Sequence, residues 1–168
     1  EPGDEVIVPT PAFGLYESIV RLCRGVFVPV DTRANDFQLT PELLDAAITE
    51  RTKVIILNSP NNPTGCVYDT ASLQAVRERV QNTGIFVLCD DVYRELTYAP
   101  GFASFAEFPD MRERSVVIQS FSKPYAMTGW RMGCLICDGP VRERLELVHQ
   151  FMVTSAPAPF QRACMAAL

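Results

Sequence analysis

A lysine in the second half of the chain follows two serines and precedes an arginine. Lys123 is one of two lysines in a chain that otherwise uses arginine, and Ser120 and Ser122 come just before it. A desolvated lysine amine can condense with an aldehyde to form a Schiff base. Arg131 offers a planar fork of donors that matches two phosphate oxygens. The segment predicts a nucleophilic amine beside an anion site, suited to a phosphorylated aldehyde; the alternative is a surface lysine.

Two acids and a tyrosine follow the apolar run 85–88. Asp90 and Asp91 come directly after a predicted strand, and Tyr93 lies just beyond them. A carboxylate at the buried end of a strand requires a cationic partner, and a protonated pyridine nitrogen would serve. A tyrosine hydroxyl can donate to an oxygen on the same ring. The alternatives are that Asp90 caps a helix and that Tyr93 fills the core.

Two loops rich in proline offer an amide and an aromatic ring. Residues 58–65 hold two prolines and a glycine, which exclude a strand or an ordinary helix. Asn62 in this loop could bind a ligand through its amide, although asparagine more often serves turn formation. Phe13 lies in the loop 9–16 and could stack on a flat ring, or else pack in the core.

Alternating strands and helices must position these residues. Helix signals occur at Thr40 and Pro41, which begin one segment, and at 69–83, which we expect Gly84 to end. Strand, helix and strand in alternation predict an α/β fold with a mainly parallel sheet and helices on both faces. The carboxyl ends of the strands should then meet at one edge. Six apolar runs read as strands covered on both faces: 6–8, 26–30, 54–57, 85–88, 116–118 and 132–137.

Composition narrows the class of protein. The chain has 168 residues and a net charge of −5 that is spread along the sequence. This distribution argues against binding nucleic acid or an anionic membrane. No apolar run reaches the roughly 20 residues of a membrane span, and no signal peptide is evident. We expect a single cytoplasmic domain.

The cysteines do not form a metal-binding pattern. Six cysteines lie mostly inside apolar runs, which predicts buried, reduced thiols. Cys134 and Cys137 form a Cys-x-x-Cys pair, but His149 is the single histidine. A zinc site would lack ligands, so we expect no metal.

These segments together resemble the class I/II aminotransferases, which are pyridoxal 5′-phosphate (PLP) enzymes of fold type I, and in particular the aspartate-aminotransferase-like branch. Four motifs carry the resemblance: Asn-Asn-Pro-Thr-Gly at 61–65, Asp-Asp-Val-Tyr at 90–93, Ser-Phe-Ser-Lys at 120–123 and Gly-Trp-Arg-Met-Gly at 129–133. The resemblance runs over essentially the whole chain. It implies amino-group transfer between an amino acid and a 2-oxo acid, by way of PLP.

The resemblance also implies a role for each site residue. Lys123 would bind PLP as a Schiff base and later move the proton between the substrate Cα and the cofactor. Asp90 would keep the pyridine nitrogen protonated, which makes the ring an electron sink. Asn62 and Tyr93 would hydrogen-bond the ring oxygen, and Phe13 would stack on the ring. Three residues would bind the phosphate: Ser120, Ser122 and Arg131.

Family members are longer than this chain and form dimers. The resemblance therefore implies that residues 1–168 are the central and C-terminal part of an incomplete PLP-binding large domain, without the N-terminal segment and the small domain. We expect such a piece to expose apolar surface and to be inactive alone. Two other functions stay open: a PLP-dependent lyase or decarboxylase on the same scaffold, and a non-catalytic, regulatory PLP-binding domain. The motifs do not identify the amino donor.

Overall fold

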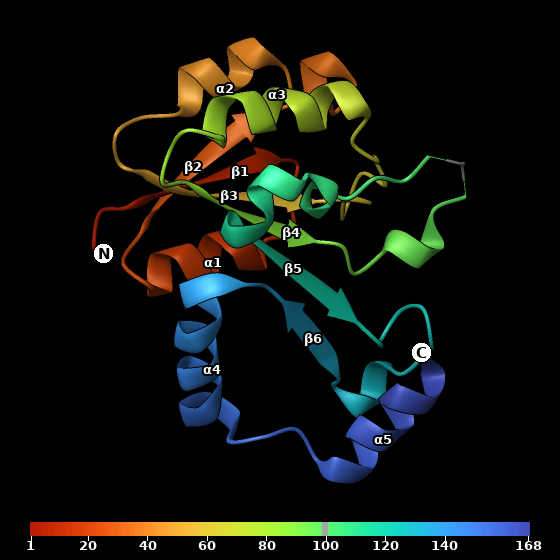
Figure 1. Ribbon diagram of the computed structural model, residues 1–168. Helices are drawn as coiled ribbons and strands as arrows, with labels where there is room; N and C mark the ends of the chain where they lie inside the picture. Colours follow the sequence, from red (N-terminus) through yellow and green to blue (C-terminus); the bar gives the residue numbers. More distant parts are fainter. Residues whose placement is uncertain (99–100) are drawn as a thin grey trace.

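The computed structural model describes residues 1–98 and 101–168 and is built around one sheet (Figure 1). The strands lie in the order β2-β1-β3-β4-β5-β6. All neighbouring pairs are parallel except β5 and β6, which are antiparallel. Each predicted apolar run forms a strand, so the mainly parallel sheet is confirmed. The strands are β1 (Glu5–Thr10), β2 (Val26–Asp31), β3 (Thr52–Asn58), β4 (Phe86–Asp90), β5 (Ser115–Ser120) and β6 (Gly133–Ile136).

Helices cover both faces of this sheet. In Figure 1, α2 and α3 lie side by side over one face, while α1 lies on the other. The α-helices are α1 (Leu15–Leu22), α2 (Pro41–Ala47), α3 (Thr70–Val80), α4 (Gly139–Val153) and α5 (Ala158–Ala167). Short 3-10 helices span Arg33–Asn35, Arg94–Leu96, Phe105–Glu107, Pro109–Arg114 and Thr128–Trp130.

Local signals explain where α2 and α3 begin, but not where α3 ends. The Thr40 hydroxyl accepts a hydrogen bond from the Leu43 N–H, and the Asp69 carboxylate accepts one from the Ser72 N–H. The prediction that Gly84 ends the second helix is wrong, because α3 stops at Val80. The guanidinium of Arg114, distant in sequence, donates to the Val80 carbonyl at 2.8 Å and to carbonyls just beyond it. A contact with a distant segment thus supplies hydrogen-bond donors to the carbonyls at the end of α3, which lack partners within the helix.

The main core lies between the sheet and the α2 and α3 layer. Ile7, Ile55 and Val87 on three neighbouring strands are fully buried, and so are Leu44 of α2 and Val76 of α3. Burial of this core stabilises the packing of the parallel strands against α2 and α3. It therefore fixes the edge at which the strands end.

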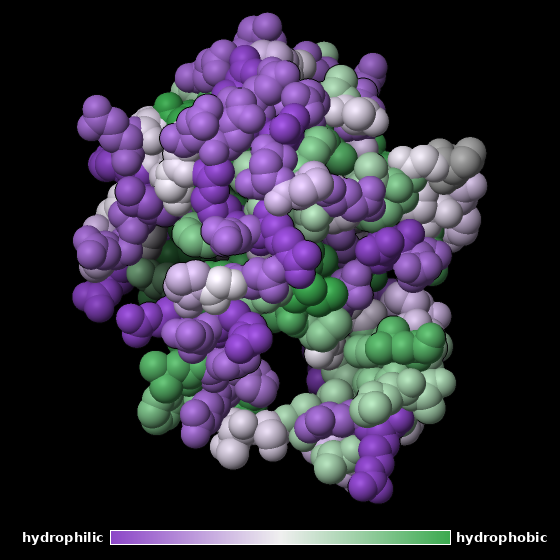
Figure 2. Space-filling view, viewed as in Figure 1, coloured by the Kyte–Doolittle hydropathy of each residue, from purple (hydrophilic) through white to green (hydrophobic). Residues whose placement is uncertain are grey.

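The last part of the chain is far less covered. The prediction that every strand is covered on both faces is wrong for the two edge strands. All four residues of β6 are exposed, and in β2 Val30 alone is buried. No residue of α4 is buried, and Phe151 on this helix is 83% exposed. Figure 2 shows hydrophobic residues around α4 and α5 on either side of an opening. The apolar surface that we expected is present here.

The cysteines differ from the prediction in their burial. All six are free thiols, but of these only Cys89 and Cys164 are buried, while Cys23 and Cys134 are exposed. Exposure of Cys134 follows from its place on the uncovered strand β6. Within the described ranges, no helix combines the length and apolarity that a membrane crossing requires.

Asp91 carries a buried carboxylate with an unpaired oxygen. The residue is 3% exposed, and Oδ2 has no partner among the described residues. Burial raises the pKa of Asp91 to about 6, although the Ser104 hydroxyl and Arg94 oppose the shift. An unfolded aspartate has a pKa of about 3.9, so the folded state holds its proton to higher pH. Stability should therefore fall as pH rises from about 4 to about 6, and stay lower above that range.

We predict that Asp91→Asn stabilises the protein at pH 8 by roughly 2 kcal/mol and by much less at pH 4.5, because the ionised carboxylate is the destabilising form. Urea unfolding at the two pH values measures the difference. Glu113→Gln, which removes an exposed carboxylate, is the control and should change neither value. Equal destabilisation by Asp91→Asn at both pH values would contradict the prediction.

Candidate active site

The carboxyl ends of four parallel strands lie at one edge of the sheet. β1, β3, β4 and β5 lie next to one another and end at Thr10, Asn58, Asp90 and Ser120. Asn58 and Asp90 are directly paired in the register of β3 and β4. The loops that carry the candidate residues follow these four ends, as the sequence predicts.

A cavity of about 390 Å³ lies at this edge, and all eight predicted site residues line it. Its volume falls within the roughly 300–1,000 Å³ of small-molecule sites. The predicted lining residues are Phe13, Asn62, Asp90, Tyr93, Ser120, Ser122, Lys123 and Arg131. Four further residues complete the wall: Tyr16, Asn58, Val92 and Thr128. The structure thus brings every candidate to one place.

The Asp90 carboxylate is half-buried and hydrogen-bonded by neutral groups. The Tyr16 hydroxyl donates to Oδ2 at 2.5 Å, and the Val92 N–H donates weakly to Oδ1 at 3.4 Å. Burial raises the pKa of Asp90, and both hydrogen bonds oppose this change. Among the described residues, no basic side chain forms an ion pair with this carboxylate. It can therefore receive a cation from a ligand.

Asn58 ties the Asn62 loop to the end of β4. Its amide nitrogen donates to the Asp90 carbonyl at 3.0 Å, and its amide oxygen accepts from the Asn62 N–H at 2.8 Å. Asn61 adds a second anchor, since its side-chain oxygen accepts from the Thr64 N–H and hydroxyl. Gly65 has a φ of 73°, a conformation that favours glycine. These bonds fix the backbone at Asn62 relative to Asp90.

Lys123 and the aromatic residues complete the cavity. The Lys123 Nζ lies 5.5 Å from the centre of the Tyr93 ring. The lysine side chain is exposed, so the expectation of a desolvated amine is wrong for this chain. Phe13 is 46% exposed and meets Tyr16 edge to face, with ring centres 6.0 Å apart. Phe13 is therefore not core and has a ring face available for stacking.

The turn after β5 gathers hydroxyls and a guanidinium. The Ser122 N–H donates to the Ser120 hydroxyl at 3.1 Å, and the Thr128 hydroxyl donates to the Ser122 carbonyl at 3.0 Å. Arg131 Nη1 donates to the Thr128 carbonyl at 2.9 Å. Arg131 also has a φ of 55°, which is strained for a residue other than glycine. Such a cluster of donors suits an oxyanion.

Four lining residues were missed by reasoning from the sequence alone, and two of them, Tyr16 and Asn58, carry a signal in the sequence. Tyr16 lies one helical turn after Phe13, and this spacing places both rings on the same side of the helix start. Asn58 is the first polar residue after an apolar run, the same signal that marks Asp90. Both signals were therefore available, but among the tyrosines and asparagines near these strand ends only Tyr93 and Asn62 were predicted as site residues.

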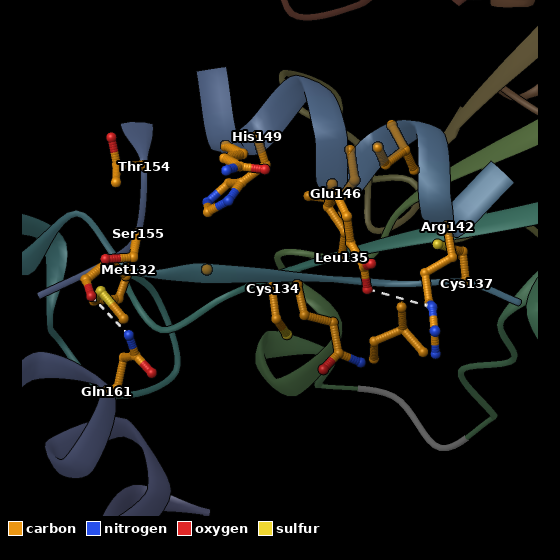
Figure 3. A pocket seen from close by; sticks show the side chains of 17 residues that line it. Met132, Cys134, Leu135, Cys137, Arg142, Glu146, His149, Thr154, Ser155 and Gln161 are labelled. Carbon is orange, nitrogen blue, oxygen red and sulfur yellow. Dashed lines mark hydrogen bonds and ion pairs between the residues drawn. The ribbon is translucent and has the colours of Figure 1, made fainter. Parts of the chain in front are cut away.

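A larger hollow of about 1,030 Å³ lies elsewhere, between β6, α4 and α5. Figure 3 shows Cys134 on β6 and His149 on α4 facing this space. Its charged residues satisfy each other, since Arg142 and Glu146 form an ion pair at 3.3 Å. In residues 1–98 and 101–168, no group of three or more His, Cys, Asp or Glu side chains could hold a metal ion. The cavity at the strand ends is the better candidate.

Comparison of the sequence with known protein families identifies the family of the chain. The sequence model described as aminotransferase class I and II matches residues 1–168. The chain belongs to this family. As a class I and II aminotransferase chain, it carries its candidate residues on the loops at the carboxyl ends of the central strands.

Individual aminotransferases agree with this assignment. An aspartate aminotransferase of Geobacillus stearothermophilus is 43% identical over 79% of the chain and 35% of its own length. A methionine aminotransferase of Escherichia coli is 33% identical over 96% of the chain and 42% of its own length. The solved aspartate aminotransferase of Thermus thermophilus with maleate is 34% identical, with a TM-score of 0.94 over 99% of the chain and 44% of its own. The chain thus spans less than half the length of these aminotransferases.

Proposed function

We propose that the complete protein is a PLP-dependent aminotransferase that moves an amino group between an amino acid and a 2-oxo acid. One observation carries the proposal: a single cavity brings together the amine of Lys123, the carboxylate of Asp90 and the donor cluster of Ser120, Ser122 and Arg131. An amine, an acid and an anion site are the three groups that a phosphorylated pyridine aldehyde requires. Family membership supports the same activity.

The residues present fit PLP. The Asp90 carboxylate lacks a basic partner among the described residues and can pair with a protonated ring nitrogen. Hydroxyls and a guanidinium meet on the turn after β5, where they would hold the phosphate. Phe13 would stack on the ring, and Asn62 and Tyr93 would donate to its oxygen. The site would thus bind the cofactor through its ring nitrogen, its phosphate, the face of its ring and its ring oxygen.

When bound, PLP supplies a ring that accepts the electron pair released at the substrate Cα. Lys123 would bond the cofactor covalently and then, as a free amine, carry the proton at Cα as general base and acid. Asp90 would keep the ring nitrogen protonated through its negative charge, which favours electron withdrawal. The hydrogen-bonded Asn62 loop and Ser122 turn would keep the ring aligned with Lys123.

The substrate range and the assembly are part of the proposal. The relatives act on aspartate or methionine, as their names state, and this chain's cavity residues do not choose between such donors. We propose that residues 1–168 form part of a PLP-binding large domain and that the complete protein is a homodimer. Six free thiols fit the reducing cytoplasm.

We expect the full protein, loaded with PLP and given an amino acid alone, to release one equivalent of the 2-oxo acid and to accumulate the pyridoxamine form. Absorbance spectra and quantification of the oxo acid measure this half-reaction. Transamination stops after one equivalent because the amino group stays on the cofactor until an acceptor arrives. Continuing release of ammonia would indicate a lyase, and cofactor binding without any product would indicate a regulatory domain; either result would overturn the proposal.

A further inference from the structure

The first turn of α1 brings a second group to the Asp90 carboxylate. Tyr16 belongs to this turn, one helical turn beyond Phe13, and its hydroxyl reaches Oδ2 of Asp90 at 2.5 Å. This distance lies in the range of hydrogen bonds from a hydroxyl to a charged oxygen, roughly 2.5–2.7 Å. The two residues are far apart in sequence, so the bond joins α1 to the end of β4.

The two oxygens of Asp90 are in unequal surroundings. Oδ2 is taken by the strong bond from Tyr16, while Oδ1 has only the Val92 N–H at 3.4 Å, beyond the usual range of roughly 2.7–3.2 Å. Oδ1 therefore keeps most of its capacity to accept a hydrogen bond. The arrangement leaves one oxygen of the carboxylate for a ligand.

Tyr16 supports the negative charge without neutralising it. Burial and the neighbouring carboxylate raise the pKa of the Tyr16 phenol, so it stays a neutral donor. Arginine or lysine at this place would pair with Asp90 and compete with a cationic ligand. The charged or titratable groups that share the cavity with Asp90 are Tyr16, Tyr93, Lys123 and Arg131. Neither of the two basic residues forms an ion pair with Asp90.

We propose that Tyr16 is a positioning residue that acts through Asp90: its neutral hydroxyl holds Oδ2 and keeps the carboxylate ionised, so that Oδ1 meets the protonated ring nitrogen of the ligand. This inference rests on the proposed function, because it takes a pyridine ring as the ligand. Tyr16 thereby determines how selectively the cavity prefers a ring nitrogen over a ring carbon at the same position.

The test compares PLP with 1-deazapyridoxal phosphate, which has a carbon in place of the ring nitrogen. Tyr16→Phe removes the hydroxyl and keeps the aromatic ring that packs against Phe13. In the full protein, we expect this variant to bind PLP about threefold more weakly, the effect of one hydrogen bond. Its affinity for the deaza analogue should be unchanged, because that analogue makes no bond to Asp90. Equilibrium titration with each compound gives the two affinities, and their ratio measures the preference for PLP over the deaza analogue.

A merely structural Tyr16 would lower both affinities together and leave the ratio unchanged, which would overturn the inference. The matched control is Tyr68→Phe, since Tyr68 is a buried tyrosine that does not line the cavity. It should alter neither affinity.

A double-mutant cycle gives a second readout. In an Asp90→Ala background, Tyr16→Phe should no longer change the preference for PLP, because the group through which it acts is gone. A persisting effect of Tyr16→Phe would refute the inference. Wild-type protein that binds neither compound would instead refute the proposed function, so the two failures are distinguishable.

Discussion

Lys123→Ala is expected to abolish covalent retention of PLP in the full protein and, with it, amino-group transfer. Among the described residues, no other lysine lines the cavity, so no other side chain can take over the bond to the cofactor aldehyde. The variant also loses the group proposed to move the proton at the substrate Cα. Loss of proton transfer alone lowers a rate on the order of 10²–10⁴-fold. The absorbance band of the lysine-bound cofactor should disappear after gel filtration.

Lys53→Ala is the matched control for this experiment. Lys53 is the chain's one other lysine and is exposed near the start of β3, at the opposite end of that strand from Asn58. Its replacement should leave both the spectrum and the turnover unchanged. An unaltered spectrum in Lys123→Ala would remove this residue from the mechanism, as would an equal loss in Lys53→Ala.

The parallel part of the fold was predictable because its signal is local. β1, β3 and β4 are short apolar runs, and their burial on both faces requires apolar residues throughout. β6 has a similar composition but lies at the edge of the sheet, where all its residues are exposed. Its position depends on pairing with β5, which composition does not encode. The sequence therefore shows that a strand exists and not how well it is covered.

Contacts between distant segments explain the other differences. The end of α3 is set by Arg114, which lies on a later 3-10 helix and donates to the last carbonyls. The Asp90 carboxylate was expected to need a cation, yet the structure also gives it a hydroxyl from Tyr16. Both partners are separated from their targets by more than 30 residues. No periodicity or capping rule connects residues so far apart.

The candidate site was predictable as a set because its residues follow strand ends. Asn62, Asp90 and Lys123 each lie within a few residues of an apolar run, and parallel strands bring those ends together. Exposure was harder to predict, since Lys123 is exposed rather than desolvated. Burial at a strand end depends on the loops that cover it, and loop packing has no simple sequence signal.

Replacing Asp90 by alanine should reduce the rate far more than the affinity for PLP. Its negative charge is proposed to hold a proton on the ring nitrogen, and the benefit grows as electrons move into the ring. Cofactor binding is also proposed to use Lys123, Phe13 and the donor cluster of Ser120, Ser122 and Arg131, all of which the variant retains. We expect kcat to fall on the order of 10³-fold and the affinity for PLP about tenfold. Single-turnover kinetics and equilibrium titration measure the two quantities.

Asp90→Asn and Asp91→Asn form a matched pair for this prediction. The two substitutions make the same chemical change at adjacent positions, but Asp91 does not line the cavity. Asp90→Asn should lower the rate almost as much as alanine does, because it keeps the shape and removes the charge. Asp91→Asn should change stability and leave turnover intact. Equal losses of rate and affinity in Asp90→Ala would mean that Asp90 supports the structure of the site, since a purely supporting residue favours no stage of the reaction.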